Sequence, residues 1–405
     1  MKRYRLEQIG EIISGGTPST KIKEYWSGDI PWITPKDLSK LKTKYITHGE
    51  RNITKQGLDN SSAKLIPKNT ILLSSRAPIG YIAIAKNTLT TNQGFKSLFC
   101  DETKCYYEYF YYWLNCNINY IIHRANGSTF KEISAKTFKK IEIDLPDLVI
   151  QKKIANILKK IDEEIEINYN INKNLEQLAK LIYNYLYIDF KLLNNVKFID
   201  SKIGKIPENW KIMTINEFVK SIMNGGTPKR KESRYWNNGK IPWLKTGEIN
   251  NNLILDSEEF ITEEGLINSS AKLLPINTVI IALYGKGTAA RVGLLKTEAT
   301  TNQACCAMIC ESYIKSVYLY LFLLNKQKQI EQIANGSVQQ NLNKKIIGNL
   351  PIIVPPDNLL NYPIFTKIYD VIYNNLKEIK SLEKLRDTLL PKLMSGEIDI
   401  SQVEL

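Results

Sequence analysis

The sequence predicts an α/β (α+β) protein in which two duplicated globular domains are separated by two long helices that form an antiparallel coiled coil, with pseudo-twofold symmetry. Three observations predict this fold class. One is a long internal repeat. The second is a mixture, in each copy, of short apolar runs and longer helix-like segments. The third is a 3-4 spacing of apolar residues after each copy.

The repeat covers almost the whole chain. The stretch GGTPSTKIKEYWSGDIPW, which begins at Gly15, returns as GGTPKRKESRYWNNGKIPW from Gly225. Three further motifs return in the same order: SSAK at Ser61 and Ser269, TTNQ at Thr90 and Thr300, and NGS at Asn126 and Asn335. The offset stays between 207 and 211, so each copy is long enough to form a domain with its own core.

The first globular domain is expected over residues 1–147. Residues 70–73 and 81–85 are short apolar runs broken by Ser, Pro and Gly, which favours strands. Residues 106–122 form a longer, aromatic-rich segment that is typical of a helix packed on a sheet. The strand-like run IEIDL ends at Pro146, where regular structure is expected to stop.

A long helix is expected over residues 148–190, because apolar residues settle there into a coiled-coil spacing. Its predicted seam also holds two polar residues, Glu164 and Asn168. The apolar seam positions are Ile150, Ile154, Ile157, Ile161, Ile171, Leu175, Leu178 and Ile182.

The second domain is expected over residues 191–356 and the second helix over 357–405. The seam of this helix is predicted to contain Ile368, Val371, Asn375, Glu378, Leu382, Leu385 and Leu389. Asn168 and Asn375 are equivalent in the repeat, and a polar residue in an apolar seam commonly fixes helix register. Because neither helix can bury its apolar stripe alone, we expect the two to pair antiparallel, with these asparagines meeting near the pseudo-twofold axis. About 37 helical residues span roughly 55 Å, or about 16 base pairs of duplex.

Charge distribution favours a polyanionic partner. The chain of 405 residues has a net charge of +14; residues 1–147 carry 22 Lys and Arg against 14 Asp and Glu, and residues 191–356 carry 21 against 13. The two connecting segments contribute no excess of positive charge. An equal excess in both copies predicts two similar surfaces for nucleic acid. Without a signal peptide or a run of about 18 apolar residues, a cytoplasmic protein that does not enter a membrane is expected.

No catalytic motif is recognisable. The strings VPPD at Val354 and YGKGTAARVG at Tyr284 match neither a base methyltransferase loop nor a phosphate-binding loop. The two histidines, His48 and His123, lie outside any triad or metal spacing, and the six cysteines form no CxxC pair. The sequence therefore predicts no catalytic residue, no metal site, no cofactor and no small-molecule substrate.

Taken together, these motifs resemble the specificity subunit of type I restriction-modification systems. The resemblance rests on GGTPS with YW and IPW, TTNQGFKSL, NGSTFKEIS, IDLPDLVIQKKIANIL, LEQLAKLIYNYLYIDF and LEKLRDTLLPKLMSGEI, in that order. It implies that residues 1–147 and 191–356 are target-recognition domains, each for one half of a bipartite double-stranded DNA sequence with a non-specific gap. It also implies that the helices are spacers docking two methyltransferase subunits, that restriction subunits join this core, and that the chain itself is not an enzyme.

Candidate DNA contacts are drawn from the repeated motifs and from the loops in which the copies differ, since Arg, Lys, Thr, Ser and Tyr side chains can reach bases or phosphates. They are Thr17, Ser19, Lys36, Ser75, Arg76, Lys229, Arg230, Lys245, Thr246, Tyr284, Lys286 and Arg291. Two readings stay open for the glycine pairs of the GGTP motif, which could offer backbone N–H groups to a phosphate or form tight turns. Trp32 and Trp243 are expected in the core.

Two alternatives belong to other functional classes. The chain could be a standalone DNA-acting enzyme, such as an endonuclease, with an unrecognised catalytic motif. It could instead be a two-headed interaction adaptor that binds no DNA. A salt titration of DNA binding separates them, because phosphate contacts make affinity fall steeply with salt.

Overall fold

The computed structural model describes residues 1–41, 43–76, 78–125, 131–191, 196–285, 287–334 and 342–400. The chain divides into two compact units. Unit 1 comprises Met1–Tyr169 and Lys377–Leu405, and unit 2 comprises Asn170–Leu376. Each unit therefore holds one globular part and one half of each long helix. Both copies of the NGS motif lie outside the described residues.

Unit 1 is built on two sheets and a short strand pair. A five-stranded sheet has the order β2-β9-β6-β7-β4, a three-stranded sheet has the order β5-β3-β8, and β1 pairs with β10. The strands are β1 (Lys2–Arg5), β2 (Gly10–Ser14), β3 (Trp26–Ile33), β4 (Tyr45–Ile46), β5 (Arg51–Ile53), β6 (Ile71–Ser75), β7 (Ile79–Ala85), β8 (Thr90–Thr91), β9 (Phe95–Cys100) and β10 (Glu142–Leu145). The helices are α1 (Pro35–Leu38), α2 (Lys55–Asp59), α3 (Tyr107–Cys116), α4 (Ile118–His123) and α5 (Ala135–Lys139).

Unit 2 repeats this topology strand for strand. Its sheets have the orders β14-β21-β18-β19-β16 and β17-β15-β20, and β13 pairs with β22. The strands are β13 (Lys211–Thr214), β14 (Ser221–Asn224), β15 (Ile241–Leu244), β16 (Asn252–Ile254), β17 (Glu259–Ile261), β18 (Val279–Ala282), β19 (Val292–Leu295), β20 (Thr300–Thr301), β21 (Cys305–Ile309) and β22 (Pro351–Val354). An extra hairpin, β11 (Phe198–Ser201) with β12 (Gly204–Pro207), precedes them. The predicted duplication and its mixed α/β character are confirmed.

The helices of unit 2 follow the same plan, with α7 (Ile215–Phe218), α8 (Glu263–Ile267), α9 (Tyr313–Ala334), α10 (Lys344–Gly348) and α11 (Asp357–Leu360). Local chemistry is repeated as well. Thr54 begins α2 by accepting a 3.0 Å hydrogen bond from Gly57 N, and Thr262 begins α8 by accepting a 3.1 Å bond from Gly265 N. A threonine hydroxyl at this place satisfies an N–H that the first helical turn leaves unpaired.

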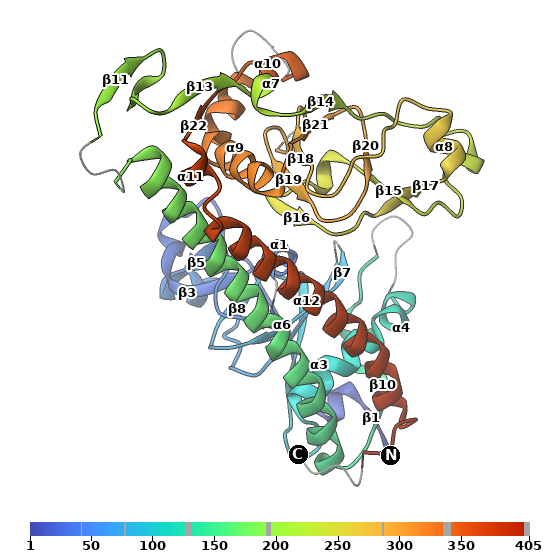
Figure 1. The fold of residues 1–405 in the computed structure, drawn as a ribbon. Coiled ribbons are helices and arrows are strands. Elements are labelled where there is room, and N and C mark those ends of the chain that lie inside the picture. Colours follow the sequence, from blue (N-terminus) through green and yellow to red (C-terminus); the bar gives the residue numbers. More distant parts are fainter. Residues whose placement is uncertain are drawn as a thin grey trace. The chain divides into compact units, whose positions relative to one another are not determined.

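The two long helices are α6 (Leu148–Tyr183), which continues through a π turn at Asn184–Ile188, and α12 (Ile364–Ser395). In each unit one half of α6, green in Figure 1, lies beside one half of α12, in red. In unit 1, Asp162 contacts Arg386 at 3.1 Å and Asn168 contacts Glu378 at 3.2 Å. Residue numbers thus fall along α12 as they rise along α6, so the paired segments are antiparallel.

The same direction holds in unit 2, where Asn172 contacts Asn375 at 2.8 Å and the hydroxyl of Tyr187, in the π turn, reaches Leu359 O, just before α12, at 3.0 Å. Asn168 and Asn375 therefore each donate from the amide to a side chain on the other helix. The role of these two asparagines in fixing register stays a prediction.

The predicted seam is only partly correct in both helices. Ile154, Asn168 and Ile368 are buried as predicted. On α6, Ile171 and Leu178 are 41% and 45% exposed and Glu164 is exposed, whereas Ile165, Asn172 and Ala179, which were not predicted in the seam, are buried. On α12, Val371 and Leu385 are 45% and 47% exposed and Glu378 is exposed, whereas Ile372, Ile379 and Leu393 are buried. A straight helix drifts by about 20° per heptad relative to a 3.5-residue repeat, so the buried face moved to the next residue.

Each globular part joins its half-helices through α3 or α9, but with different chemistry. In unit 1 the joint is a buried polar network. The carboxylate of Glu108 on α3 is 1% exposed and lies 3.8 Å from Lys44 Nζ and 3.4 Å from Lys159 Nζ. Tyr112 donates a 2.5 Å hydrogen bond to Asp162, which also accepts from Arg386. Burial lowers the pKa of Lys44, because low-dielectric surroundings disfavour the ammonium form.

In unit 2 the corresponding joint is aromatic. Tyr187 lies at the centre of a cluster in which its ring centroid is 5.2 Å from that of Tyr318, 5.8 Å from Phe365 and 5.9 Å from Trp210. Tyr320 of α9 packs edge-on against Tyr369 of α12 at 5.5 Å. Such edge-to-face pairs add to the free energy gained from burying the rings. The two copies thus share their strands but differ at their helix joints.

Candidate nucleic-acid interface

The GGTP loop follows β2 in unit 1 and β14 in unit 2, and its glycines are required by close packing. A Cβ on Gly16 would lie 2.3 Å from Ser62 C, and one on Gly226 would lie 2.4 Å from Ser270 C. The N–H of Gly16 donates to Thr91 O at 2.9 Å, and that of Gly226 donates to Thr301 O at 2.8 Å. These N–H groups are already used inside the fold, so the reading in which they bind a phosphate is wrong for Gly16 and Gly226.

Two tryptophan side chains hydrogen-bond to the GGTP loop of unit 1. The indole N–H of Trp32 donates to Gly16 O at 2.9 Å, and that of Trp26 donates to Ser19 O at 3.0 Å. The two rings meet edge to face, with centroids 5.0 Å apart. Both ends of the loop are therefore fixed by the same aromatic pair.

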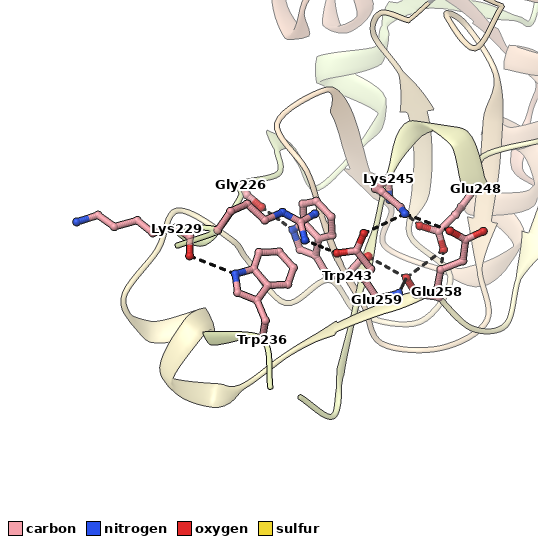
Figure 2. A network of polar contacts seen from close by, with 10 residues as sticks. Gly226, Lys229, Trp236, Trp243, Lys245, Glu248, Glu258 and Glu259 are labelled. Carbon is pink, nitrogen blue, oxygen red and sulfur yellow. Dashed lines mark hydrogen bonds and ion pairs between the residues drawn. The ribbon is translucent and has the colours of Figure 1, made fainter. Parts of the chain in front are cut away.

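Unit 2 repeats the arrangement, as Figure 2 shows. Trp243 donates to Gly226 O at 2.9 Å and Trp236 donates to Lys229 O at 3.2 Å, with ring centroids 5.1 Å apart. Trp32 and Trp243 are 6% and 2% exposed, which confirms the prediction that they belong to the core. The side chain of Lys229 extends away from the tryptophan pair (Figure 2) and is exposed.

A glutamine of the TTNQ motif lies against each GGTP loop. The hydroxyl of Thr17 hydrogen-bonds to Gln93 Oε1, and that of Thr227 donates to Gln303 Oε1 at 2.5 Å. Both glutamines are exposed. Because the carbonyl end of each amide is held by a threonine, its NH₂ end is left to donate outward. The repeat of TTNQ was the signal in the sequence that could have placed these glutamines among the candidates.

In unit 1, Arg76 and Lys36 flank the turn that follows Gln93. A Cβ added to Gly94 would lie 3.5 Å from Pro35 Cγ, next to Lys36, and 3.8 Å from Arg76 Cγ. The structure thus gathers Thr17, Lys36 and Arg76 around one turn, with Ser19 exposed at the end of the GGTP loop.

Ser75 does not belong to this surface. It is fully buried on β6, and its N–H and C=O bond to Gly94 O and Ile133 N. The prediction that it contacts DNA is therefore wrong. Every residue of β6 is buried, and this includes Ser75 at the end of the strand.

Acidic side chains form ion pairs with two of the candidate lysines, Lys36 and Lys245. In unit 1, Glu50 lies 3.0 Å from Lys36 Nζ and 2.9 Å from Lys40 Nζ. The hydrogen bonds from Lys40 and then Lys36 lower the pKa of Glu50 to about 2. Asp37, in the first turn of α1, positions this glutamate by accepting a 2.8 Å bond from its backbone N–H.

A similar pairing of lysine with carboxylates is found in unit 2 (Figure 2), where Lys245 Nζ lies 3.0 Å from Glu259 and 3.1 Å from Glu258. These two bonds raise the pKa of Lys245. Glu248 accepts a 2.9 Å bond from Glu258 N, as Asp37 does from Glu50. A phosphate approaching these lysines must therefore compete with carboxylates.

In unit 2, the loop between β18 and β19, where the two copies differ in sequence, brings Tyr284 and Thr246 together. A Cβ on Gly285 would lie 3.8 Å from Thr246 Oγ1, and Tyr284 is 42% exposed. Arg291 is held by a hydrogen bond to Asn250 Oδ1. Lys286 lies outside the described residues.

Arg51 is a residue that sequence reasoning missed. Its guanidinium carbon lies 3.4 Å from the ring centroid of Trp26 and 5.7 Å from that of Trp32. In unit 2 the guanidinium of Arg230 lies 3.8 Å from Trp236 and 4.5 Å from Trp243. No signal in the repeat marked Arg51, because the equivalent strand position in unit 2 is a glutamate.

Within the described ranges no group of three or more His, Cys, Asp or Glu side chains could hold a metal ion. Cys100, Cys105, Cys305 and Cys306 are buried free thiols, as expected for structural cysteines. None of the helices in the described part of the chain combines the length and apolarity that a bilayer span requires.

Comparison with known proteins gives the family. The profile of the type I restriction modification DNA specificity domain matches this chain twice, over residues 1–177 and 207–384. The chain belongs to this family. The two matches coincide with the two copies of the repeat, so the DNA specificity domain is the duplicated element.

The relatives with which this chain aligns are specificity subunits. The chain is 36% identical to the type I restriction enzyme MjaIX specificity subunit of Methanocaldococcus jannaschii, over 98% of this chain and 94% of the relative. It is 22% identical to the HindI specificity subunit of Haemophilus influenzae, over 69% and 73%. Its fold is similar to that of a type I restriction-modification S subunit from M. genitalium, with a TM-score of 0.59, 18% identity and coverage of 97% and 95%. The role of such a subunit is DNA recognition rather than catalysis.

Proposed function

We propose that this specificity subunit binds a bipartite double-stranded DNA target, with one globular part on each half-site and a non-specific gap between them. The single observation that carries this proposal is the pairing of a repeated scaffold with different variable loops. The GGTP loop, its tryptophan pair and the TTNQ glutamine are the same in both units. The loops that carry Arg76 in one unit and Tyr284 and Arg291 in the other differ.

A scaffold shared by both units suits contacts that do not depend on sequence. Phosphate contacts fix the position of a protein on the duplex, whereas contacts to base edges carry the sequence information. We therefore assign Thr17 with Gln93, and Thr227 with Gln303, to positioning. Arg76 and Arg291, whose guanidinium groups can take two acceptors of a guanine, are assigned to recognition.

The paired carboxylates fit this division. A lysine that is held by Glu50 or Glu258 contributes little to indiscriminate attraction of phosphates, because the carboxylate cancels its charge at close range. Only DNA that also satisfies the neighbouring loop would displace the carboxylate. The arrangement therefore favours selectivity over raw affinity.

The partners follow from family membership. We propose that the helix pair docks two methyltransferase subunits, that restriction subunits join this core, and that the subunit needs no cofactor of its own. Exposed apolar side chains on α6, among them Ile171, Leu178 and Leu181, give such a partner a surface to bury. The complex would act on DNA in the cytoplasm.

Domain exchange tests the proposal. Residues 1–147 are replaced by the same block of another family member, and the modified sequence is mapped with the methyltransferase subunit present. We expect one half of the target to change and the other to stay the same. A change in both halves would mean that the two globular parts share one composite site. Methylation or cleavage by the purified chain alone would contradict the non-catalytic role.

A further inference from the structure

A guanidinium group covers the tryptophan pair in both units, but it comes from different positions of the repeat. In unit 1, Arg51 of β5 lies directly across from Trp32 in the antiparallel pairing of β5 with β3. In unit 2 the residue across from Trp243 in the pairing of β17 with β15 is Glu259. Arg51 and Glu259 are therefore structural equivalents with opposite charge.

The arginine of unit 2 comes instead from the GGTP loop. Counting from the first glycine of each GGTP motif, Arg230 is equivalent to Thr20. Its guanidinium lies over Trp236 and Trp243 at 3.8 Å and 4.5 Å, and it is paired with Glu259. The loop thus supplies in unit 2 the positive charge over the tryptophan pair that the strand supplies in unit 1.

A need to hold the tryptophan rings in place does not explain why a guanidinium lies over them in both units. In both units the rings are already held by edge-to-face contact and by two indole hydrogen bonds. An exposed cation–π contact adds only about 0.5–1 kcal/mol. A positive group kept at one place through two different residues points to a ligand with the opposite charge.

The geometry also leaves the guanidinium groups of both arginines able to bind a phosphate. Arg51 is exposed, and its guanidinium forms no hydrogen bond or ion pair with any described residue. A guanidinium stacked on an indole keeps its N–H edge open and loses little side-chain freedom when it binds, so it is well suited to two-point contact with a phosphate. Both arginines adjoin the GGTP loop, because the indoles beneath them bond to Gly16, Ser19, Gly226 and Lys229.

We propose that Arg51 and Arg230 are equivalent phosphate-binding residues, each of which contacts the DNA backbone at one half-site regardless of base sequence. This inference rests on the proposed DNA-binding function. Glu259 forms an ion pair with Arg230, whereas Arg51 has no acidic partner among the described residues. Arg51 therefore makes the stronger contribution to phosphate binding.

The experiment measures binding of the full chain to a duplex of arbitrary sequence as a function of salt. Each phosphate neutralised by a cation contributes about 0.9 to the slope of log K against log salt. Arg51→Gln is therefore expected to reduce the slope by about 0.9 and to weaken binding several-fold at low salt. Lys180→Gln, which removes an exposed charge on α6, is the matched control and is expected to leave the slope unchanged.

Moving the positive charge from position 51 to position 20 distinguishes a role in binding from a merely structural role. Arg51→Glu alone is expected to reduce the slope at least as much as Arg51→Gln. Adding Thr20→Arg to Arg51→Glu reproduces the arrangement of unit 2 in unit 1, and it is expected to recover most of the wild-type slope. Thermal melting and the near-ultraviolet circular dichroism of the tryptophans are measured on every variant.

The outcomes are distinct. If Arg51→Gln lowers the melting temperature while the slope stays at the wild-type value, the arginine only braces the tryptophans and the inference is overturned. Failure of Thr20→Arg to recover the slope in a folded double variant would also overturn it. If the wild-type chain, with or without its methyltransferase partner, shows no salt-dependent binding, the proposed DNA-binding function fails instead.

Discussion

Asn375 of α12 donates a 2.8 Å hydrogen bond from its amide to Oδ1 of Asn172 on α6, in unit 2. Asn172 is 5% exposed, and its own Nδ2 is buried without a hydrogen-bond partner in the described structure. A buried polar group that is left unpaired costs about 1–3 kcal/mol. We therefore predict that this pair lowers stability and fixes how the helices align.

Replacing both asparagines should stabilise the protein. We expect Asn172→Leu with Asn375→Leu to raise the free energy of unfolding by about 1 kcal/mol, because the double variant removes the unpaired amide. Asn375→Leu alone should lower it by about 1–2 kcal/mol, since Asn172 then loses its remaining bond. Urea-induced unfolding is measured for both variants and the wild type. A double variant less stable than the wild type would show that the pair stabilises the fold.

The close packing of the GGTP loop predicts a position-specific effect of alanine. In Gly226→Ala the new Cβ would meet the backbone of Ser270 and Ala271 at 2.4 and 2.5 Å, so the GGTP loop must shift. We expect a loss of about 2 kcal/mol or more in stability and at least a tenfold loss of DNA affinity. Gly247→Ala, where no atom lies within 4 Å of the new Cβ, is the control. Equal behaviour of the two variants in melting and binding assays would contradict the packing argument.

Removing the carboxylate that holds two lysines should strengthen non-specific DNA binding. In Glu50→Gln, Lys36 and Lys40 lose their ion pairs and become free to neutralise phosphates. We expect higher affinity for arbitrary duplex and a slope of log K against log salt that is steeper by up to about 1.8, or about 0.9 for each freed lysine. Glu11→Gln removes an exposed carboxylate with no lysine partner in the described structure, and it controls for net charge. An unchanged slope would mean that these lysines do not approach DNA.

Glu50 should also titrate at unusually low pH. Its pKa, lowered to about 2 by Lys40 and Lys36, is depressed in the folded state. The stability contributed by its ion pairs is therefore present above the ordinary glutamate pKa of 4.5 and lost as pH falls from there toward about 2. Carboxyl chemical shifts followed by NMR should show this pKa, and Lys40→Met should raise it. A Glu50 pKa near 4.5 in the wild-type chain would show that the pairs do not form in solution.

The length of the helices predicts the spacing of the target. Inserting one heptad into both α6 and α12 lengthens each by about 10 Å, which corresponds to roughly three base pairs of duplex. We expect the tolerated gap between half-sites to grow by that amount while both half-sites stay the same. Mapping of methylated sites in the assembled complex provides the measurement. A constant gap would show that the helices do not set the spacing.

The sequence was most informative where the same residues occur twice. The repeats at Gly15 and Gly225 predicted a duplication that the structure reproduces strand for strand, because a repeated motif in the same order must serve the same packing. The 3-4 spacing predicted both long helices. It did not give their buried face over 30 residues, since a small drift per heptad moved burial from Ile171 to Asn172.

Contacts between distant loops could not be predicted in the same way. Nothing in the sequence links Lys36 to Glu50 or Lys245 to Glu259, because those ion pairs depend on how the loops fold back. Arg51 was missed because its counterpart is Arg230, at another position of the repeat, so that a comparison of aligned positions shows only a difference. Ser75 was chosen for its hydroxyl, but strand packing determines whether a hydroxyl is accessible.

The two helix joints have a consequence for how such proteins can be recombined. The polar joint around Glu108 and the aromatic joint around Tyr187 present incompatible surfaces to α6 and α12. Transplanting the first globular part into the second place would set Glu108 and Lys44 against aromatic rings, with no partner for either charge. The two halves of the chain are therefore not interchangeable. We expect exchange of first globular parts with first parts, and of second with second, to preserve these joints, whereas exchange between the two places in one chain would leave the buried charges without partners.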